Sequence, residues 1–89
     1  MSQTVHVSLE AAVAELVAKV TDGTIDAESA HRSAQTFAEA GMTSLSFLRL
    51  VDALEIDYGV EIDLETDLDS MRTVASIADY LRSNGVAHG

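Results

Sequence analysis

The sequence predicts an all-α fold, a small bundle of three main helices and one short helix with a long first loop. The chain has 89 residues, enough for one domain with a single modest core. Aromatic residues make up only 4% of the chain, and leucine, valine and alanine supply most of its apolar side chains, a composition that favours helical bundles. We therefore expect one domain over residues 1–89, folded over about 7–84, with frayed termini.

The first helix is predicted over residues 8–20, with Ser8 as its N-cap. Its apolar residues recur at the spacing of one helix face: Leu9, Val13, Leu16, Val17 and Val20. Thr21-Asp22-Gly23-Thr24 breaks this pattern, so residues 21–43 are expected to form a long connection with room for one short helical turn near 27–33. The side chains expected to anchor this connection to the core are Phe37 and Met42.

The central helix is predicted over residues 44–58. Either Thr43 or Ser44 can cap its start, and Gly59 ends it because glycine readily adopts the left-handed conformation found at helix C-termini. Its inward face is expected to consist of Phe47, Leu50, Val51, Leu54 and Tyr58.

One minor turn and one more helix are predicted after the central helix. The stretch 67–71 can form a single helical turn. The last helix is expected over residues 74–83, with Thr73 as its N-cap and Asn84-Gly85 as its stop. Its inward side chains are expected to be Val74, Ile77, Ala78 and Leu81.

The chain is strongly acidic, with 15 Asp and Glu residues against 5 Lys and Arg residues and a formal net charge of −10. Eight of the acids fall in one stretch without a basic residue: Asp52, Glu55, Asp57, Glu61, Asp63, Glu65, Asp67 and Asp69. Such a chain repels nucleic acid and anionic lipid, and its scattered basic residues form no patch for a phosphate backbone. We therefore exclude a nucleic-acid partner and favour basic protein surfaces.

The lack of cysteine and of long apolar stretches limits both the chemistry and the cellular location that the chain can have. The absence of cysteine excludes disulfides, a thiolate nucleophile and a cysteine-based zinc site. The first residues lack the basic region of a secretory signal, and no apolar stretch is long enough to cross a bilayer. We expect a cytoplasmic monomer that makes no membrane contact.

The segment Gly41-Met42-Thr43-Ser44-Leu45 is the best candidate for chemistry. Ser44 falls in the first turn of the predicted central helix, where free backbone N–H groups and the positive end of the helix dipole favour a phosphate ester on its oxygen. Gly41 permits a sharp turn into the helix, which leaves the hydroxyl at a corner that a modifying enzyme can reach. The alternative is that Ser44 is only a helix cap.

The outward face of the same helix predicts a docking surface. Apolar and charged residues alternate there, whereas an ordinary solvated helix would carry Lys or Glu in place of Leu48 and Ile56. The residues of this face are Leu45, Leu48, Arg49, Asp52, Glu55 and Ile56.

The sequence resembles the acyl and peptidyl carrier proteins, and the resemblance covers nearly the whole chain. Carriers typically have a glycine, a hydrophobic residue, Asp or His, and then Ser-Leu, the register in which Gly41-Met42-Thr43-Ser44-Leu45 stands. Tyr58-Gly59-Val60-Glu61-Ile62 is similar to the exit of the family's central helix. The stretch from Met71 to Leu81 is similar to the family's last helix.

The resemblance implies a four-helix carrier domain that catalyses nothing. Ser44 would be the attachment residue for 4′-phosphopantetheine, transferred from coenzyme A by a phosphopantetheinyl transferase. The terminal thiol would hold acyl or aminoacyl groups as thioesters, and the six residues of the outward face would meet the transferase and an acyltransferase, ligase or synthase. The core and any acyl-accepting cleft would be lined by Phe47, Leu50, Leu54, Tyr58, Val74, Ile77 and Leu81.

Two residues depart from the family pattern. Thr43 replaces the usual Asp before the serine, which removes a charge that helps the transferase dock in relatives. Arg49 stands where carriers of fatty-acid synthesis commonly have an acid. The arginine favours a free-standing carrier of a specialised polyketide or nonribosomal pathway, such as antibiotic biosynthesis, with its own matched enzymes.

Other classes of function are less well supported. A serine hydrolase would need a base near Ser44, but the histidines lie far along the chain and no Gly-x-Ser-x-Gly motif is present. The alternating acids at 61–69 lack the glycine and the glutamate of a calcium loop, so we expect no metal site. The main alternative is a helical interaction module without a prosthetic group, in which Ser44 is only a cap.

Overall fold

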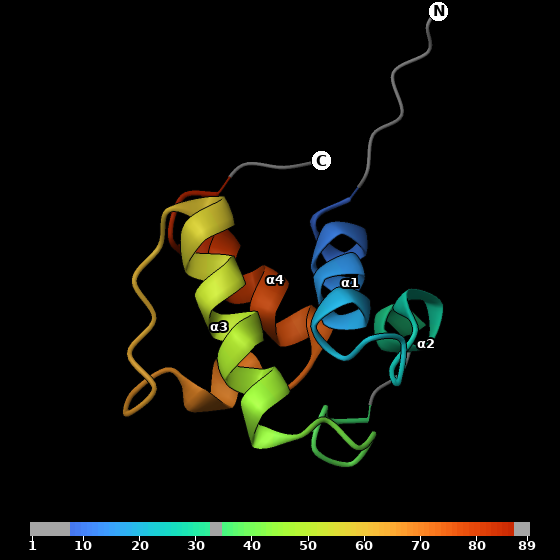
Figure 1. Ribbon diagram of the computed structural model, residues 1–89. Helices are drawn as coiled ribbons and strands as arrows, with labels where there is room; N and C mark the ends of the chain where they lie inside the picture. Colours follow the sequence, from blue (N-terminus) through green and yellow to red (C-terminus); the bar gives the residue numbers. More distant parts are fainter. Residues whose placement is uncertain (1–7, 33–34, 87–89) are drawn as a thin grey trace, which may run out of the picture.

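The computed structural model describes residues 8–32 and 35–86, and these form helices without any strand. Four α-helices and one 3-10 helix follow each other along the chain: α1 (Leu9–Val20), α2 (Ala27–Arg32), α3 (Ser44–Tyr58), η1 (Leu68–Met71) and α4 (Val74–Ser83). The all-α prediction is therefore confirmed, and the three main helices begin and end within one residue of their predicted bounds (Figure 1). The expected fraying of the termini lies outside the described residues.

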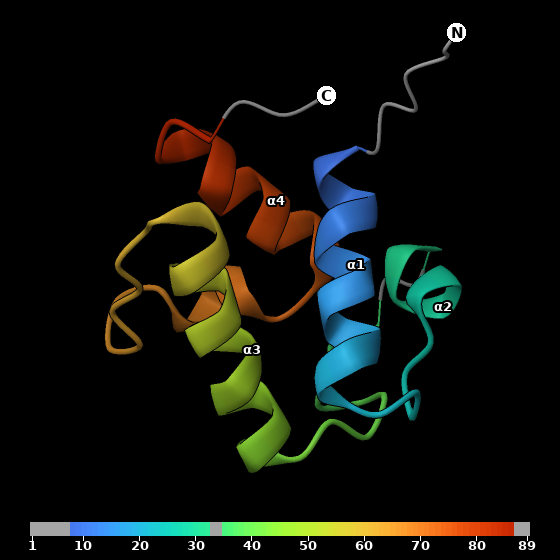
Figure 2. The ribbon, with the colours of Figure 1, turned by 45° about the horizontal axis from the view of Figure 1, so that its top comes forward.

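Helix α1 is the central packing element. It contacts α2, α3 and α4, and in both ribbon views it lies between α2 and α3 (Figures 1 and 2). The short helix η1 contacts α4. The loop between α3 and η1 runs along the side of α3 that faces away from α1 (Figure 2). The arrangement therefore leaves one side of α3 covered by this loop and the start of α3 beside the first loop.

The core is built from the predicted apolar faces of the three main helices. Leu9, Val13 and Val17 of α1 are fully buried, and each such side chain contributes about 1.5–3 kcal/mol when it leaves water. The same holds for the fully buried residues Leu50, Leu54, Ile77 and Leu81 of α3 and α4. Met71 of η1 is also fully buried, which the sequence did not indicate because a single turn has no apolar periodicity.

Four residues predicted to face inward are only partly buried. Leu16 and Val20 lie at the edge of α1 and line a shallow groove between α1 and α3. Phe47 and Tyr58 of α3 are also half-buried and pack against the rim of the core. The reason is that the predicted stripes are wider than the contact area of these short helices, so their outermost members meet solvent.

The first loop is more ordered than a plain connection. Thr21 is buried, and its hydroxyl donates to the Val17 carbonyl at 2.8 Å and accepts from the Ile25 N–H at 3.2 Å. The short turn predicted near 27–33 is the helix α2. Of the two predicted anchors, Phe37 is buried in the core and Met42 is half-buried against it. The loop thus delivers the chain to the start of α3 along a defined path.

Candidate functional site

The start of α3 gives Thr43 and Ser44 different roles. Thr43 is the N-cap: its backbone is extended, its hydroxyl oxygen accepts from the Ser46 N–H at 3.1 Å, and its carbonyl accepts from the Phe47 N–H at 2.9 Å. Ser44 is the first helical residue and is exposed. The sequence left the choice of cap open, and the structure assigns it to Thr43. The Ser44 hydroxyl is therefore not required for capping.

Gly41 makes the turn that brings the chain into α3. Its φ of 99° lies in the region that side chains with a Cβ rarely adopt, and the space around it is otherwise open. The Gly41 N–H donates to the Ala38 carbonyl at 3.1 Å, and the Met42 N–H donates to the Phe37 carbonyl at 2.9 Å. The glycine therefore closes a tight turn directly before the cap, as the sequence predicted.

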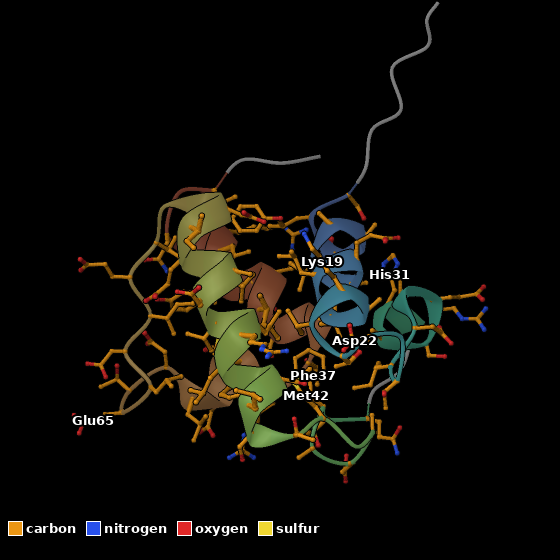
Figure 3. The ribbon with its side chains drawn as sticks, viewed as in Figure 1. Lys19, Asp22, His31, Phe37, Met42 and Glu65 are labelled. Atoms are coloured by element: carbon orange, nitrogen blue, oxygen red, sulfur yellow. The ribbon has the colours of Figure 1, made fainter. Side chains whose placement is uncertain are left out.

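A hollow of about 400 Å³ opens beside Ser44. It is bounded by the first loop, the first turn of α3 and the junction between η1 and α4. Its large apolar side chains are Phe37, Met42, Phe47, Leu68 and Met71. Figure 3 labels Phe37 and Met42, which lie near each other close to the start of α3. Ser44 is thus at the rim of a largely apolar recess.

The hollow differs from the cleft that the resemblance implied. Of the seven residues expected to line the core and the cleft, Phe47 reaches the hollow beside Ser44, while Tyr58 is half-buried at the rim of the core. The other five are buried in the core itself: Leu50, Leu54, Val74, Ile77 and Leu81. The hollow is completed by Leu68, Met71 and Arg72, for which the sequence gives no sign of a place near Ser44. Only the tertiary structure brings them there, because more than twenty residues separate them from Ser44 along the chain.

The junction between η1 and α4 is held by side-chain hydrogen bonds. Thr73 caps α4 by accepting from the Ser76 N–H at 3.1 Å, and the Thr73 N–H donates to the Ser76 hydroxyl oxygen at 3.1 Å. The Ser76 hydroxyl donates in turn to the Ser70 carbonyl at 2.8 Å. This network fixes the wall of the hollow that the η1–α4 junction provides.

Five of the six residues expected on the outward face of α3 are exposed. Leu45, Leu48 and Ile56 are exposed by 60%, 54% and 72%, and Arg49 and Asp52 are exposed beside them. Glu55 is different: it is half-buried, and its carboxylate accepts from the Ile62 N–H at 2.9 Å. Glu55 therefore holds the loop that follows α3, a role that the sequence did not reveal.

The acidic stretch after α3 uses several of its carboxylates within the fold. Asp67 accepts from the Asp63 N–H at 3.0 Å and from the Tyr80 hydroxyl at 3.1 Å, and that hydroxyl also lies 2.9 Å from the Glu61 carbonyl. Burial raises the pKa of the Tyr80 hydroxyl, and the hydrogen bond to Asp67 raises it further. Figure 3 shows Glu65 at the tip of this loop, pointing away from the bundle.

Neither metal binding nor histidine chemistry is supported at the described positions. No group of three or more His, Asp or Glu residues there is arranged to hold a metal ion. His31 is exposed on α2, with α1 between it and α3 (Figure 3). Among the same residues, none of the helices has the length and apolar character needed to span a membrane.

Comparison with known proteins identifies the family. Residues 11–81 match the family described as "Phosphopantetheine attachment site". The chain is also 41% identical over 63 residues to an acyl carrier protein of Syntrophobacter fumaroxidans, a match that covers 71% of this chain and 76% of that protein. The chain belongs to the acyl carrier protein family. No solved structure is significantly similar to it.

Membership of this family establishes the general function. Acyl carrier proteins are carriers and not catalysts, and this family carries covalently attached 4′-phosphopantetheine. The carrier meets a phosphopantetheinyl transferase and the enzymes of its pathway. The alternative of an interaction module without a prosthetic group is therefore not retained.

The described residues fit this cofactor. Attachment needs an exposed hydroxyl. Ser44 is exposed, and the N-cap of α3 is Thr43 and not Ser44. The arm is a phosphodiester followed by a largely aliphatic amide chain, and the hollow beside Ser44 is lined by one basic residue, Arg72, and by apolar side chains.

Proposed function

We propose that Ser44 is the residue that carries 4′-phosphopantetheine, and that the carrier presents acyl or aminoacyl groups to enzymes of a specialised polyketide or nonribosomal pathway. The observation that carries this proposal is the division of roles at the start of α3. Thr43 caps the helix, so Ser44 is left exposed at its first turn beside a hollow. A serine that served as the cap would lose that hydrogen bond on modification.

The attachment chemistry needs little from the carrier itself. The Ser44 oxygen forms a new bond to the phosphorus of coenzyme A that bears the pantetheine, the pyrophosphate P–O bond breaks, and adenosine 3′,5′-bisphosphate leaves. The hydroxyl proton passes to a base of the transferase. The positive end of the α3 dipole favours the phosphodiester that results. When bound, the arm supplies a thiol that binds carboxylic acids as thioesters.

The outward face of α3 is the surface that we propose for partner enzymes. Its three exposed apolar residues are framed by charged residues, the pattern of a docking surface with an apolar centre. Arg49 places a cation within a face that is otherwise acidic, which favours partners whose surfaces include a matching acid. This mixed pattern, together with Thr43, supports a dedicated pathway over general fatty-acid synthesis.

The experiment that tests the attachment site is intact-mass measurement after co-expression with a phosphopantetheinyl transferase. We expect the wild-type chain to gain a single phosphopantetheine and Ser44→Ala to gain none. Ser46→Ala is a matched control in the same helical turn, and it should be modified like the wild type. Modification of Ser44→Ala, or a mass that stays unchanged for the wild type under several transferases, would contradict the proposal.

A further inference from the structure

The hollow beside Ser44 has one cationic wall. Arg72, at the junction between η1 and α4, lines this hollow together with Ser44. The other basic side chains lie elsewhere: Lys19 and Arg49 in the groove between α1 and α3, Arg32 on α2, and Arg82 on α4. In a chain with a net charge of −10, most surfaces repel an anion. Of the Lys and Arg residues, Arg72 is therefore the one that shares a hollow with Ser44.

The backbone of Arg72 is fixed relative to the loop that leads to Ser44. The Arg72 carbonyl accepts from the Phe37 N–H at 2.9 Å, and the Phe37 side chain is buried in the core. The next residue, Thr73, is the N-cap of α4. The guanidinium is therefore carried by a rigid part of the fold, on a side chain long enough to follow a ligand at the rim of the hollow.

The ion pair between Arg72 and Asp69 leaves N–H donors of the guanidinium available to a second anion. The guanidinium pairs with the Asp69 carboxylate at 3.0 Å, with the two side chains exposed by 56% and 90%. An exposed ion pair of this kind contributes at most about 1 kcal/mol. A guanidinium has five N–H donors and can donate to two phosphate oxygens at once. It can therefore bind a phosphodiester while it stays near Asp69.

We propose that Arg72 binds the phosphodiester of the arm on Ser44 and holds the root of the arm against the hollow. This proposal rests on the proposed attachment at Ser44. Arg72 acts as a positioning residue: it restricts the directions in which the arm leaves the protein, and it brings the first aliphatic part of the arm near Met42 and Leu68. Asp69 competes with the phosphodiester for the same guanidinium and so weakens this hold.

The proposal is tested by phosphorus NMR of the modified protein, after its mass has shown one phosphopantetheine. In the wild type, we expect the phosphodiester resonance to differ from that of free phosphopantetheine esters. It should move toward the free value as ionic strength rises from about 0.01 M to about 1 M, over which the screening length falls from about 30 Å to about 3 Å. Arg72→Gln should give the free value at low salt and lose most of this salt response.

Two further variants test whether the phosphorus resonance shifts in the expected direction. Asp69→Asn removes the competing carboxylate, so its resonance should be displaced further than that of the wild type and should keep the displacement to higher salt. Arg32→Gln removes another exposed, ion-paired arginine, which lies on α2 and pairs with Glu28, and this variant should behave like the wild type. Arg72→Gln and Arg32→Gln change the net charge equally, so a difference between them is not a general charge effect.

A second measurement needs no substitution. The Arg72 side-chain Nε–Hε resonance should move when the unmodified wild-type chain is converted to the modified form, whereas that of Arg32 should not. The proposal is overturned if this resonance stays in place, or if a folded Arg72→Gln variant keeps the wild-type phosphorus resonance and salt response. A chain that is never modified at Ser44 would overturn the proposed attachment site as well, so the mass measurement separates the two failures.

Discussion

Two neighbouring hydroxyl residues do different work at the start of α3. Thr43 accepts from the Ser46 N–H and so stabilises the helix, while Ser44 stays exposed. Carriers with an aspartate before the serine also have a good N-cap residue there, so threonine changes the local charge and keeps a cap. The departure from the family pattern at Thr43 therefore retains the cap, and we expect its main consequence in recognition by the transferase.

The cap predicts a measurable stability effect. Thr43→Ala should lower the free energy of unfolding by about 1 kcal/mol, because it leaves the Ser46 N–H without its partner. Thr43→Asp should retain the stability of the wild type or exceed it slightly, because aspartate caps helices and also interacts favourably with the dipole. Urea unfolding followed by circular dichroism measures both. Equal stability of Thr43→Ala and wild type would show that the capping bond contributes nothing.

Glu55 and Asp52 are one turn apart on α3 but should behave differently. Asp52 is exposed and has its charge available to partners, whereas the Glu55 carboxylate is bound to the Ile62 N–H. We expect Asp52→Lys to slow partner-dependent loading of the arm and to reduce the salt sensitivity of that rate. Glu55→Gln should change loading less, since an amide oxygen can still accept from the Ile62 N–H.

Loading rates at several salt concentrations, measured with the cognate loading enzyme, test this contrast. Glu55→Ala is the structural control, and it should cost about 1 kcal/mol of stability because the Ile62 N–H loses its partner. Unchanged loading by Asp52→Lys would remove the outward face of α3 from partner recognition.

At the scale of elements, α3 has well-defined ends. It begins at the Thr43 cap and ends at Gly59, whose φ of 67° is left-handed and whose N–H donates to the Glu55 carbonyl at 2.9 Å. A Cβ at Gly59 would meet no atom within 4 Å, so a substitution there is disfavoured by backbone conformation alone. The loop beyond Gly59 is then fastened back onto the helix by Glu55.

Substitutions at Gly59 therefore test the cost of the left-handed backbone at the end of α3. Gly59→Ala should lower the free energy of unfolding by about 1–2 kcal/mol, the cost of placing an L-residue in the left-handed region. Gly59→Asn should cost less, because asparagine tolerates this conformation better than alanine does. Thermal unfolding of the two variants and the wild type gives the order. Equal losses from Ala and Asn would point to a cause other than the left-handed backbone.

At the scale of the whole molecule, an ion pair joins the first helix to the last one. The Arg82 guanidinium of α4 lies 2.8 Å from the Glu10 carboxylate in the first turn of α1, 72 residues away in the chain. The Arg82 hydrogen bond holds the pKa of Glu10 below its ordinary value. A carboxylate with a lowered pKa stabilises the fold above its unfolded-state pKa, and this contribution disappears as the pH falls through the folded-state value.

Glu10→Gln should consequently lower the free energy of unfolding at neutral pH by about 0.5 kcal/mol, a small value because both side chains remain partly exposed. The difference from the wild type should vanish at acidic pH, where the wild-type carboxyl is protonated too. Glu28→Gln, which removes an exposed 3.7 Å pair with Arg32 within α2, is the control and should have no measurable effect. A difference that persists unchanged at acidic pH would contradict the assignment to charge.

The sequence by itself determined the helices, most of the core and the candidate attachment residue. Apolar spacing, caps and stop residues are local signals, so the bounds of α1, α3 and α4 followed from them, and the Gly41-to-Leu45 segment was sufficient to single out Ser44. The tertiary structure decided which hydroxyl caps α3, how Glu55 is used, and that Arg72 shares a hollow with Ser44. These contacts depend on how separate segments pack, and residue order within one segment carries no information about that packing.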